Sequence, residues 1–208
     1  MSTPLIGILS LQGGVAEHQR VLDSLKVAHR LVRKPADLDG LDGLIFPGGE
    51  STTMSHLLVT ESMFDPVREA LRAGLPAFGT CAGMILLADE VLDTRADAVS
   101  FGVLPVTVRR NAFGRQAQSF EADLDMVGFD EPVHAVFIRA PQVEIADDEV
   151  EVLARVPEGH GDHSGAVVAV RCGNILATSF HPECQPGETR LHEYFVTECV
   201  GGAVGTQA

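Results

Sequence analysis

The chain has 208 residues, of which 45% are hydrophobic and 21% are charged, and its formal net charge at pH 7 is −14. These values are typical of one globular domain with a sizeable core. The negative charge argues against non-specific binding to nucleic acid or to an anionic membrane. No apolar stretch is long enough to cross a bilayer and the N-terminus lacks a signal-peptide pattern, so we expect no membrane association.

The cysteines bear on the cellular compartment. Cys81, Cys172, Cys184 and Cys199 show neither the spacing of a disulfide framework nor a CxxC motif. Cysteines spaced in this way are typical of a reducing compartment, so we expect a cytoplasmic protein. No internal repeat divides the chain. We therefore predict a single domain over residues 1–200, followed by a disordered tail over residues 201–208.

Short apolar runs alternate with helix-like patterns in the first half of the chain. An apolar run of a few residues, bounded by turn residues, is typical of a parallel strand that is buried on both faces. The predicted strands cover residues 5–9, 29–33, 44–46 and 75–78. Apolar residues at helical spacing follow these strands, beginning near residues 15, 54, 64 and 84.

The second half of the chain is richer in strands. These are predicted over residues 103–108, 136–138, 150–156, 166–170 and 175–180. Segments 150–156 and 166–170 flank a loop and are expected to pair antiparallel. The whole pattern predicts an α/β fold, an open and mostly parallel doubly wound sheet with helices on both faces and a small antiparallel β extension.

The segment Gly79-Thr80-Cys81-Ala82-Gly83 joins a predicted strand to a predicted helix. This is the cysteine version of the nucleophile elbow, in which glycines allow the backbone to fold closely on itself. Cys81 is therefore a candidate nucleophile. The alternative is a buried cysteine between two turn glycines, because cysteine is often buried without a chemical role.

His181 and Glu183 directly follow the last clear strand. Residues two apart in an extended segment point to the same side, so both side chains can stand beyond that strand end. A histidine that acts as a base needs an acceptor to orient it, and Glu183 is placed to supply one. The alternative is a strand-end histidine beside a surface glutamate. Active sites of open parallel sheets form beyond the carboxyl ends of strands, so we expect His181 to meet Cys81 in one crevice.

A glycine pair, Gly48-Gly49, follows the third predicted strand and precedes the Ser/Thr-rich segment 51–53. The segment lacks the lysine of a P-loop and the third glycine of a dinucleotide fingerprint, which argues against a nucleotide site. Its backbone N–H groups could instead face a developing oxyanion. Alternatively, the loop only caps the next helix through Ser51 or Thr52.

Two polar segments lie later in the chain. Residues 109–116 carry three arginines, which suggests a carboxylate partner or, equally, ion pairs with Glu121 or Asp123. His160 and His163 could bind a metal, but two ligands in a glycine-rich loop favour a solvated hairpin tip instead. We therefore predict no metal site.

Segments spread over nearly the whole chain resemble one family. The elbow and His181-Pro182-Glu183 resemble the class I (triad) glutamine amidotransferases, which have a flavodoxin-like fold. Other segments are similar more narrowly to the glutaminase-subunit family of pyridoxal 5'-phosphate synthase. The matching segments are residues 7–13 with Glu17-His18, 47–54, 78–83, 110–116, 119–122, 136–141 and 179–183.

The resemblance implies a reaction and a set of site residues. Cys81 would attack the side-chain amide of L-glutamine, His181 would move the protons and Glu183 would orient His181, so that a thioester intermediate yields L-glutamate and ammonia. An oxyanion hole would come from backbone N–H groups of Gly48 or Gly49 and of Ala82. By the same analogy, glutamine would bind to Gly49, Glu50, Ser51, Arg110, Ile138 and Arg139.

The resemblance also implies a partner and no cofactor. Ammonia would pass to a separate (β/α)₈ synthase subunit, in a large ring-based hetero-oligomer that makes pyridoxal 5'-phosphate in vitamin B6 biosynthesis. The chain departs from the family pattern at Cys184 and in the long loop 157–165. The alternatives are a glutaminase subunit of another amidotransferase, a general cysteine hydrolase of similar fold, and a non-catalytic binding module. Ala82, where that class of hydrolase has a histidine, argues against the second, and an intact Cys81, His181 and Glu183 argues against the third.

Overall fold

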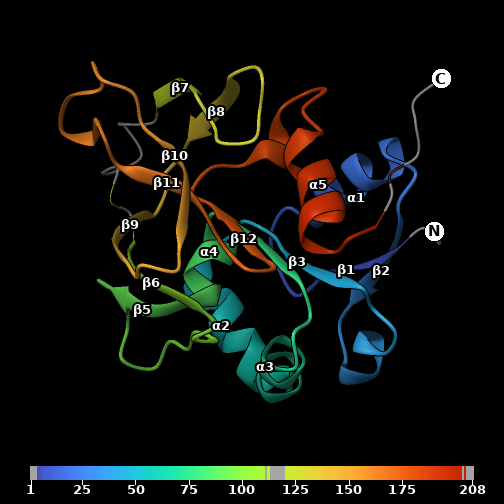
Figure 1. Ribbon diagram of the computed structural model, residues 1–208. Coiled ribbons are helices and arrows are strands. Elements are labelled where there is room, and N and C mark those ends of the chain that lie inside the picture. Colours follow the sequence, from blue (N-terminus) through green and yellow to red (C-terminus); the bar gives the residue numbers. More distant parts are fainter. Residues whose placement is uncertain (1–3, 111, 113–119, 203, 205–208) are drawn as a thin grey trace.

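A computed structural model describes residues 4–110, 112, 120–202 and 204 (Figure 1). In this part of the chain a ten-stranded sheet runs in the order β2-β1-β3-β4-β12-β11-β9-β6-β5, with β10 paired to β11. The strands from β2 to β12 in that order are parallel to one another. They are β1 (Leu5–Leu9), β2 (Ala28–Val32), β3 (Gly43–Phe46), β4 (Ala77–Thr80) and β12 (Ile175–Thr178).

The other end of the sheet is mainly antiparallel. There β11 runs antiparallel to β12, β10 and β9, and β9 runs antiparallel to β6, whereas β5 and β6 are parallel. These strands are β5 (Ala88–Leu92), β6 (Leu104–Arg109), β9 (Gln142–Ala146), β10 (Glu151–Arg155) and β11 (Val167–Cys172). A separate antiparallel pair is formed by β7 (Phe120–Leu124) and β8 (Val133–Phe137).

Helices cover both faces of the parallel part of the sheet (Figure 1). On one face lie α1 (Val15–Ser24), α5 (Arg190–Tyr194) and the π-helical turn Phe195–Cys199. On the other face lie α2 (Ser51–Thr60), α3 (Phe64–Arg72) and α4 (Ala82–Leu87). Short 3₁₀ turns occur at Pro35–Leu38, Gly161–His163 and Pro182–Cys184.

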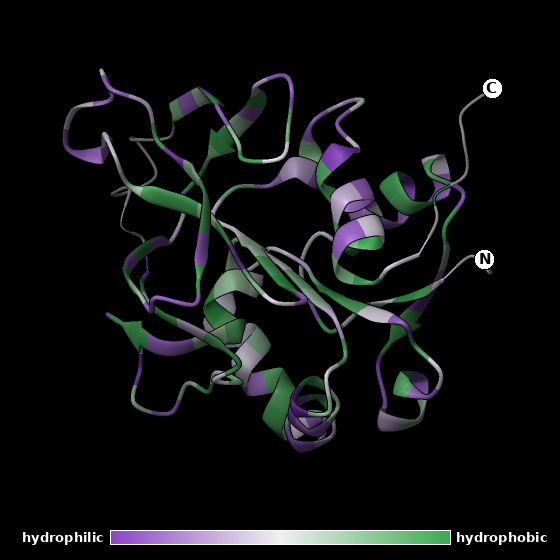
Figure 2. Cartoon of the chain, viewed as in Figure 1, coloured by the Kyte–Doolittle hydropathy of each residue, from purple (hydrophilic) through white to green (hydrophobic). Residues whose placement is uncertain are grey.

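Two apolar cores lie between the sheet and these helix layers. Alternate residues of each parallel strand enter different cores, as Ile45 does on the α1 side and Leu44 and Phe46 do on the α4 side. A strand buried on both faces must be apolar at successive positions, which is why the central strands read as continuous apolar runs. Figure 2 shows β1 and β11 as largely apolar between more hydrophilic loops. Among the described residues, no helix is long and apolar enough to cross a membrane.

The α/β fold class with a mostly parallel sheet, helices on both faces and a small antiparallel extension is confirmed. Three strands that the sequence did not predict are β5, β7 and β9. Each exposes charged residues on at least one face, as Asp89 and Glu90 do in β5, so none reads as an apolar run. Of the tail 201–208, residues 203 and 205–208 lie outside the described residues, and the disorder of the tail stays a prediction.

The register of the central strands places the sequence motifs at one edge of the sheet. Phe46 of β3 pairs with Gly79 of β4, and Thr80 of β4 pairs with Thr178 of β12. The three strands therefore end side by side. The chain segments that leave them begin with Pro47, Cys81 and Ser179, and they form the rim of one cleft.

Candidate active site

A cleft beyond the carboxyl ends of β3, β4 and β12 contains every site residue that the sequence predicted. This location follows from the parallel strands, because their carboxyl ends and the loops that follow them share one edge. The residues that line the cleft from the predicted set are Gly48, Gly49, Glu50, Ser51, Cys81, Ala82, Arg110, Ile138, Arg139, His181 and Glu183. Their gathering in one place is thereby observed, whereas their individual roles stay predictions.

Cys81 occupies a strained elbow between β4 and α4. Its backbone has φ 49° and ψ −101°, a conformation that a residue other than glycine rarely adopts, and its N–H donates to the Thr178 carbonyl at 2.8 Å. The turn is tight because a Cβ atom on Gly83 would lie 2.1 Å from the Phe46 carbonyl oxygen. The chain therefore needs a glycine two residues after Cys81, as the Gly-x-Cys-x-Gly pattern predicts.

His181 lies between the elbow and Glu183. Its Nδ1 is 2.8 Å from Oε1 of Glu183, whose side chain is buried. Burial lowers the pKa of His181, but the neighbouring Cys81 and Glu183 outweigh burial and raise it above its ordinary value. Burial raises the pKa of Glu183, but His18 and His181 outweigh burial and hold it well below its usual range. An ionised Glu183 accepts the Nδ1–H of His181, which leaves Nε2 of His181 for proton transfer.

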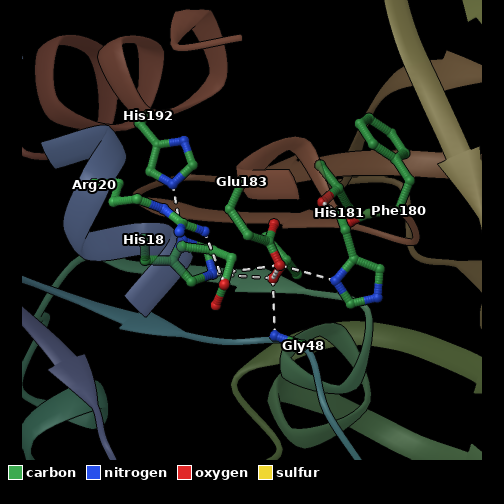
Figure 3. Close-up of polar contacts among 10 residues, drawn as sticks. His18, Arg20, Gly48, Phe180, His181, Glu183 and His192 are labelled. Carbon is green, nitrogen blue, oxygen red and sulfur yellow. Dashed lines mark hydrogen bonds and ion pairs between the residues drawn. The ribbon is translucent and has the colours of Figure 1, made fainter. Parts of the chain in front are cut away.

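A buried polar network lies behind Glu183 (Figure 3). The Thr80 hydroxyl donates to Oε1 of Glu183 at 3.2 Å and accepts the Gly48 N–H at 3.0 Å. Nε2 of His18 is 3.3 Å from the same hydroxyl and 3.6 Å from Oε1 of Glu183. Nδ1 of His18 is 2.8 Å from Nε2 of His192 on α5. Glu183 therefore has hydrogen-bonding neighbours on two sides, His181 on the cleft side and Thr80 on the core side.

The two core histidines are neutral in the folded protein. Burial lowers the pKa of His18, and burial together with His18 lowers the pKa of His192 to about 3. Both rings are fully buried, and both lie beside Phe78, with centroid separations of 6.4 Å for His18 and 5.4 Å for His192. Among the described residues, Oε2 of Glu183 and Nδ1 of His192 have no hydrogen-bond partner.

The network corrects one predicted role in the glycine pair. The Gly48 N–H is directed to Thr80 rather than to the cleft, so in this structure it is not available to a developing oxyanion. Gly48 is instead needed for space, because a Cβ atom on it would lie 2.1 Å from Cε1 of His181. Gly49 is also constrained, because a Cβ atom there would lie 2.3 Å from Oε1 of Gln12.

Glu50 is the N-cap of α2, so the expectation that Ser51 or Thr52 would cap this helix was wrong. Its carboxylate accepts the N–H groups of Thr52 at 3.1 Å and Thr53 at 2.7 Å. Glutamate reaches these donors because its longer side chain folds back over the first turn, a role usually taken by shorter residues. Gln12 supports the same loop by accepting the Glu50 N–H at 3.0 Å.

Two arginines of the basic segment 109–116, Arg109 and Arg110, lie in different surroundings. Arg110 contacts Glu50 in the cleft at 3.2 Å, and its side chain is largely buried. Arg109 lies outside the cleft and pairs with Asp93 and Glu144, each at 2.7 Å. For Arg109 and Arg110, these contacts take the place of the pairs with Glu121 or Asp123 that the sequence left open. Arg115 and Gln116 lie outside the described residues.

Ile138 and Arg139 follow β8 at the opposite wall of the cleft. Ile138 is 48% exposed, which is high for a large apolar side chain, and Arg139 is exposed with a positive φ of 48°. An exposed cation and an exposed apolar side chain beside a cleft are typical of a binding surface. Their position is consistent with the predicted contact with substrate.

Within the described residues, the remaining histidine-containing candidates lie against an aromatic ring or in the cleft itself. Rings of His160 and His163 pack on Phe120 at centroid separations of 5.3 and 5.4 Å. Within the described residues, a three-donor group suited to a metal consists of His181, Glu183 and Cys184. All three of these residues line the cleft, so the group belongs to the site already described.

Sequence reasoning missed the supporting residues. Thr80 lies inside the elbow motif, and Gln12 and His18 lie inside segments matched to the family, but the motifs assign a role to none of them. His192 carries no local signal for a function. A histidine at helical spacing within an apolar pattern reads as a core residue, and only the three-dimensional structure brings His18 and His192 together from positions 174 residues apart.

Comparisons with known proteins show what the whole chain is similar to. Residues 8–201 match the model of the SNO glutamine amidotransferase family. A protein of Rhodococcus opacus named pyridoxal 5'-phosphate synthase subunit PdxT is 54% identical, with 94% of this chain and 97% of that protein covered. A PdxT of Nocardia farcinica is 57% identical, with coverages of 94% and 85%. A crystal structure described as a glutamine amidotransferase superposes with a TM-score of 0.83 at 46% identity, covering 94% of this chain and 98% of that one.

The fold is that of a glutamine amidotransferase, and the sequence similarity covers most of the length of these relatives. The chain belongs to the SNO glutamine amidotransferase family.

Proposed function

We propose that this protein hydrolyses L-glutamine to L-glutamate and ammonia and delivers the ammonia to a synthase subunit that makes pyridoxal 5'-phosphate. The observation that carries the proposal is the convergence of Cys81, His181 and Glu183 in one cleft of a glutamine amidotransferase fold. The identity of 54–57% to proteins named pyridoxal 5'-phosphate synthase subunit PdxT supports the particular pathway.

The first half of the reaction is acylation of Cys81. His181 accepts the thiol proton at Nε2 while the sulfur attacks the side-chain amide carbon of glutamine. The tetrahedral intermediate then collapses as His181 returns a proton to the amide nitrogen, so that the C–N bond breaks and ammonia leaves. Glu183 supports both steps because its carboxylate holds Nδ1–H of His181 at 2.8 Å and stabilises the imidazolium.

The second half is hydrolysis of the γ-glutamyl thioester. Water attacks the thioester carbon, His181 takes a proton from the water, and the C–S bond breaks to release glutamate and the Cys81 thiol. Backbone N–H groups of Gly49 and Ala82 are the proposed donors to the oxyanion, since the Gly48 N–H is engaged by Thr80. Ala82 is the first residue of α4, where a backbone N–H has no acceptor within the helix.

Glutamine binding uses the charged groups at the two walls of the cleft. The α-carboxylate requires cationic donors, for which Arg110 and Arg139 are the candidates, and the α-ammonium requires an acceptor, for which Glu50 is the candidate. Gly49 and Ser51 line the floor, and Ile138 supplies an apolar contact to the methylene groups. The ion pair between Arg110 and Glu50 links these two roles.

The finer partner assignment is also part of the proposal. The synthase subunit is taken to be a (β/α)₈ barrel in a large hetero-oligomer in the cytoplasm, which receives ammonia without its release to solvent. A protein that passes on ammonia must exclude water from the path of the product, and a docked partner over the open cleft would do so.

The test is reconstitution with a purified pyridoxal 5'-phosphate synthase subunit and glutamine that carries ¹⁵N in the side-chain amide. The proposal predicts ¹⁵N in the pyridoxal 5'-phosphate that forms, and unlabelled free ammonium should dilute it little. Cys81→Ala is the control that removes glutamine-dependent synthesis while synthesis from free ammonium continues. Glutamine hydrolysis without transfer of ¹⁵N would indicate a glutaminase of another amidotransferase, and no hydrolysis with the synthase present would overturn the proposal.

A further inference from the structure

We infer that Thr80 is a positioning residue for Glu183, and that His18 and His192 fix the direction of its hydroxyl proton. The inference deepens the proposed glutaminase function and rests on it. It concerns a buried side of the site that substrate does not reach, because Thr80, His18 and His192 are each fully buried. The donors and acceptors around one hydroxyl group determine the arrangement.

The Thr80 hydroxyl has three neighbours for its one proton and two lone pairs. The Gly48 backbone N–H at 3.0 Å is a donor, so it occupies one lone pair. Oε1 of Glu183 at 3.2 Å is an acceptor when ionised, so it must receive the hydroxyl proton. The remaining neighbour, Nε2 of His18 at 3.3 Å, meets the second lone pair and must therefore carry a proton.

The state of His18 then determines the state of His192. Because burial keeps His18 neutral and its Nε2 is protonated, its Nδ1 is an acceptor. The contact of 2.8 Å from this Nδ1 to Nε2 of His192 requires a donor on His192. His192 is thus also neutral with its proton on Nε2, which leaves an acceptor lone pair at Nδ1, the atom without a partner among the described residues.

The chain of donors runs from His192 through His18 and Thr80 to Glu183. Figure 3 labels the two histidines and Glu183. Its consequence for catalysis lies in Oε1 of Glu183, which receives the Thr80 hydroxyl on one side and Nδ1–H of His181 on the other. Oε2 has no hydrogen-bond partner among the described residues, so the orientation of the carboxylate depends on Oε1. Without the Thr80 hydroxyl, Glu183 would retain His181 as its hydrogen-bonding neighbour and could rotate with it.

The Thr80 hydroxyl can support Glu183 only if its proton points toward the carboxylate. If Nε2 of His18 lacked a proton, it would compete with Glu183 for the Thr80 proton, and the hydroxyl oxygen would then face an ionised carboxylate without a proton between them. His192 prevents this by donating to Nδ1 of His18 and so holding the proton of His18 on Nε2. The two histidines act through Thr80 and touch neither substrate nor the reacting atoms.

The test compares Thr80→Val, which keeps the shape and removes the hydroxyl, with Thr80→Ser, which keeps the hydroxyl. Measured with the synthase subunit present, Thr80→Val should lower kcat/KM for glutamine by about 10- to 100-fold, mainly in kcat, and Thr80→Ser should stay within about threefold of wild type. Thr107→Val is the matched control. Thr107 is a buried strand threonine whose hydroxyl donates to Glu90 at 3.0 Å, away from the cleft, and its removal should leave kcat/KM unchanged.

Two further readouts separate positioning from stability. The acid limb of the kcat/KM profile should move to lower pH in Thr80→Val, because His181 must be neutral to accept the thiol proton and a misaligned Glu183 no longer raises its pKa to the same extent. The loss from Thr80→Val should also fall below about threefold in a Glu183→Gln background, since Thr80 is inferred to act through Glu183. A merely structural role would lower activity equally in both backgrounds.

The histidines are tested by a second matched pair. His18→Gln keeps an N–H donor near the position of Nε2, whereas His18→Leu removes it, so Gln should retain more activity than Leu. Equal kcat/KM in wild type and Thr80→Val, or equal loss in Thr80→Val and Thr80→Ser, would overturn the inference while leaving wild-type glutaminase activity intact. Absence of glutaminase activity in the wild-type complex would instead overturn the proposed function, so the two failures are distinguishable.

Discussion

The imidazole ring of His181 lies directly against Gly48, so that a Cβ atom added at residue 48 would be 2.1 Å from Cε1 of the ring. The glycine therefore determines how closely His181 can approach the loop after β3. The imidazole ring occupies the space beside the Gly48 backbone, so residue 48 cannot carry a side chain unless the ring moves. The relationship explains the glycine requirement without any contribution of Gly48 to an oxyanion hole.

Gly48→Ala is expected to displace His181 and to lower kcat by about 100-fold, because a shift of about 1 Å in a catalytic group costs that much. The loop is short and continues into the exposed residues Gly49 and Glu50, so the midpoint of thermal unfolding should change little. Steady-state glutaminase assays with the synthase subunit, together with a melting curve, check this. Wild-type kcat in Gly48→Ala would show that the ring is free to move away.

Cys81→Ala should abolish ammonia release from glutamine, because Cys81 supplies the sulfur of the thioester. The variant should still bind the synthase subunit, since Cys81 is buried at the elbow. Ammonia measurement and co-elution of the two subunits on gel filtration give the two readouts. Continued transfer of glutamine nitrogen by the variant would rule out the mechanism.

His181→Asn should stop acylation, with a loss in kcat on the order of 10⁶-fold, as for removal of the histidine base from other nucleophile–base pairs. Labelling of Cys81 by a glutamine-analogue electrophile, followed by mass spectrometry, measures this step alone. Protection by glutamine in the wild type is the control. A normal rate of thioester formation in His181→Asn would refute its role as the base.

Arg110 and Arg109 form a natural pair for testing substrate binding. Arg110 contacts Glu50 inside the cleft, whereas Arg109 pairs with Asp93 and Glu144 outside it. Arg110→Gln should raise KM for glutamine by about tenfold with a smaller change in kcat, as expected from loss of a charged hydrogen bond to a carboxylate. Arg109→Gln should leave KM unchanged. Equal values of KM in both variants would remove Arg110 from the substrate-binding set.

His192 predicts how stability depends on pH. Its pKa is about 3 in the folded protein and near 6.5 when unfolded, so unfolding binds a proton between these values. Stability is therefore present above pH 6.5 and decreases as the pH falls, by about 1.4 kcal/mol per pH unit for one proton. Urea unfolding from pH 7 to pH 4 should show a shallower decrease for His192→Gln than for wild type. Identical slopes would mean that His192 is protonated in the folded state.

The sequence predicted the parts of the site that depend on strand ends. The apolar runs before Cys81 and His181 have the period and length of buried parallel strands, and parallel strands end at one edge. Residues that directly follow such strands are therefore expected to share one cleft, as Cys81 and His181 do. The glycine of the elbow is predictable for a different reason, because a tight turn imposes a local requirement that is visible in the sequence.

The remaining features depend on contacts between distant residues. Glu50 caps α2 although shorter residues follow it, and the direction of the Gly48 N–H depends on Thr80, which lies 32 residues away. His18 and His192 occur on amphipathic helices, where a buried histidine has the same spacing as an apolar core residue. Such partners can be identified only when the packing of α1 and α5 against the sheet is known.

Phe78 connects the apolar core on the α1 and α5 side of the sheet to the buried polar network behind Glu183. Phe78 and Thr80 are two residues apart on β4, so their side chains point to the same face, where Phe78 meets His192 edge-on at 5.4 Å. The apolar core on this face therefore also holds an imidazole in place. A substitution that only changes volume at Phe78 would be transmitted to Glu183 through His192 and His18. On this side of the sheet, core packing therefore bears on the chemistry of the site as well as on stability.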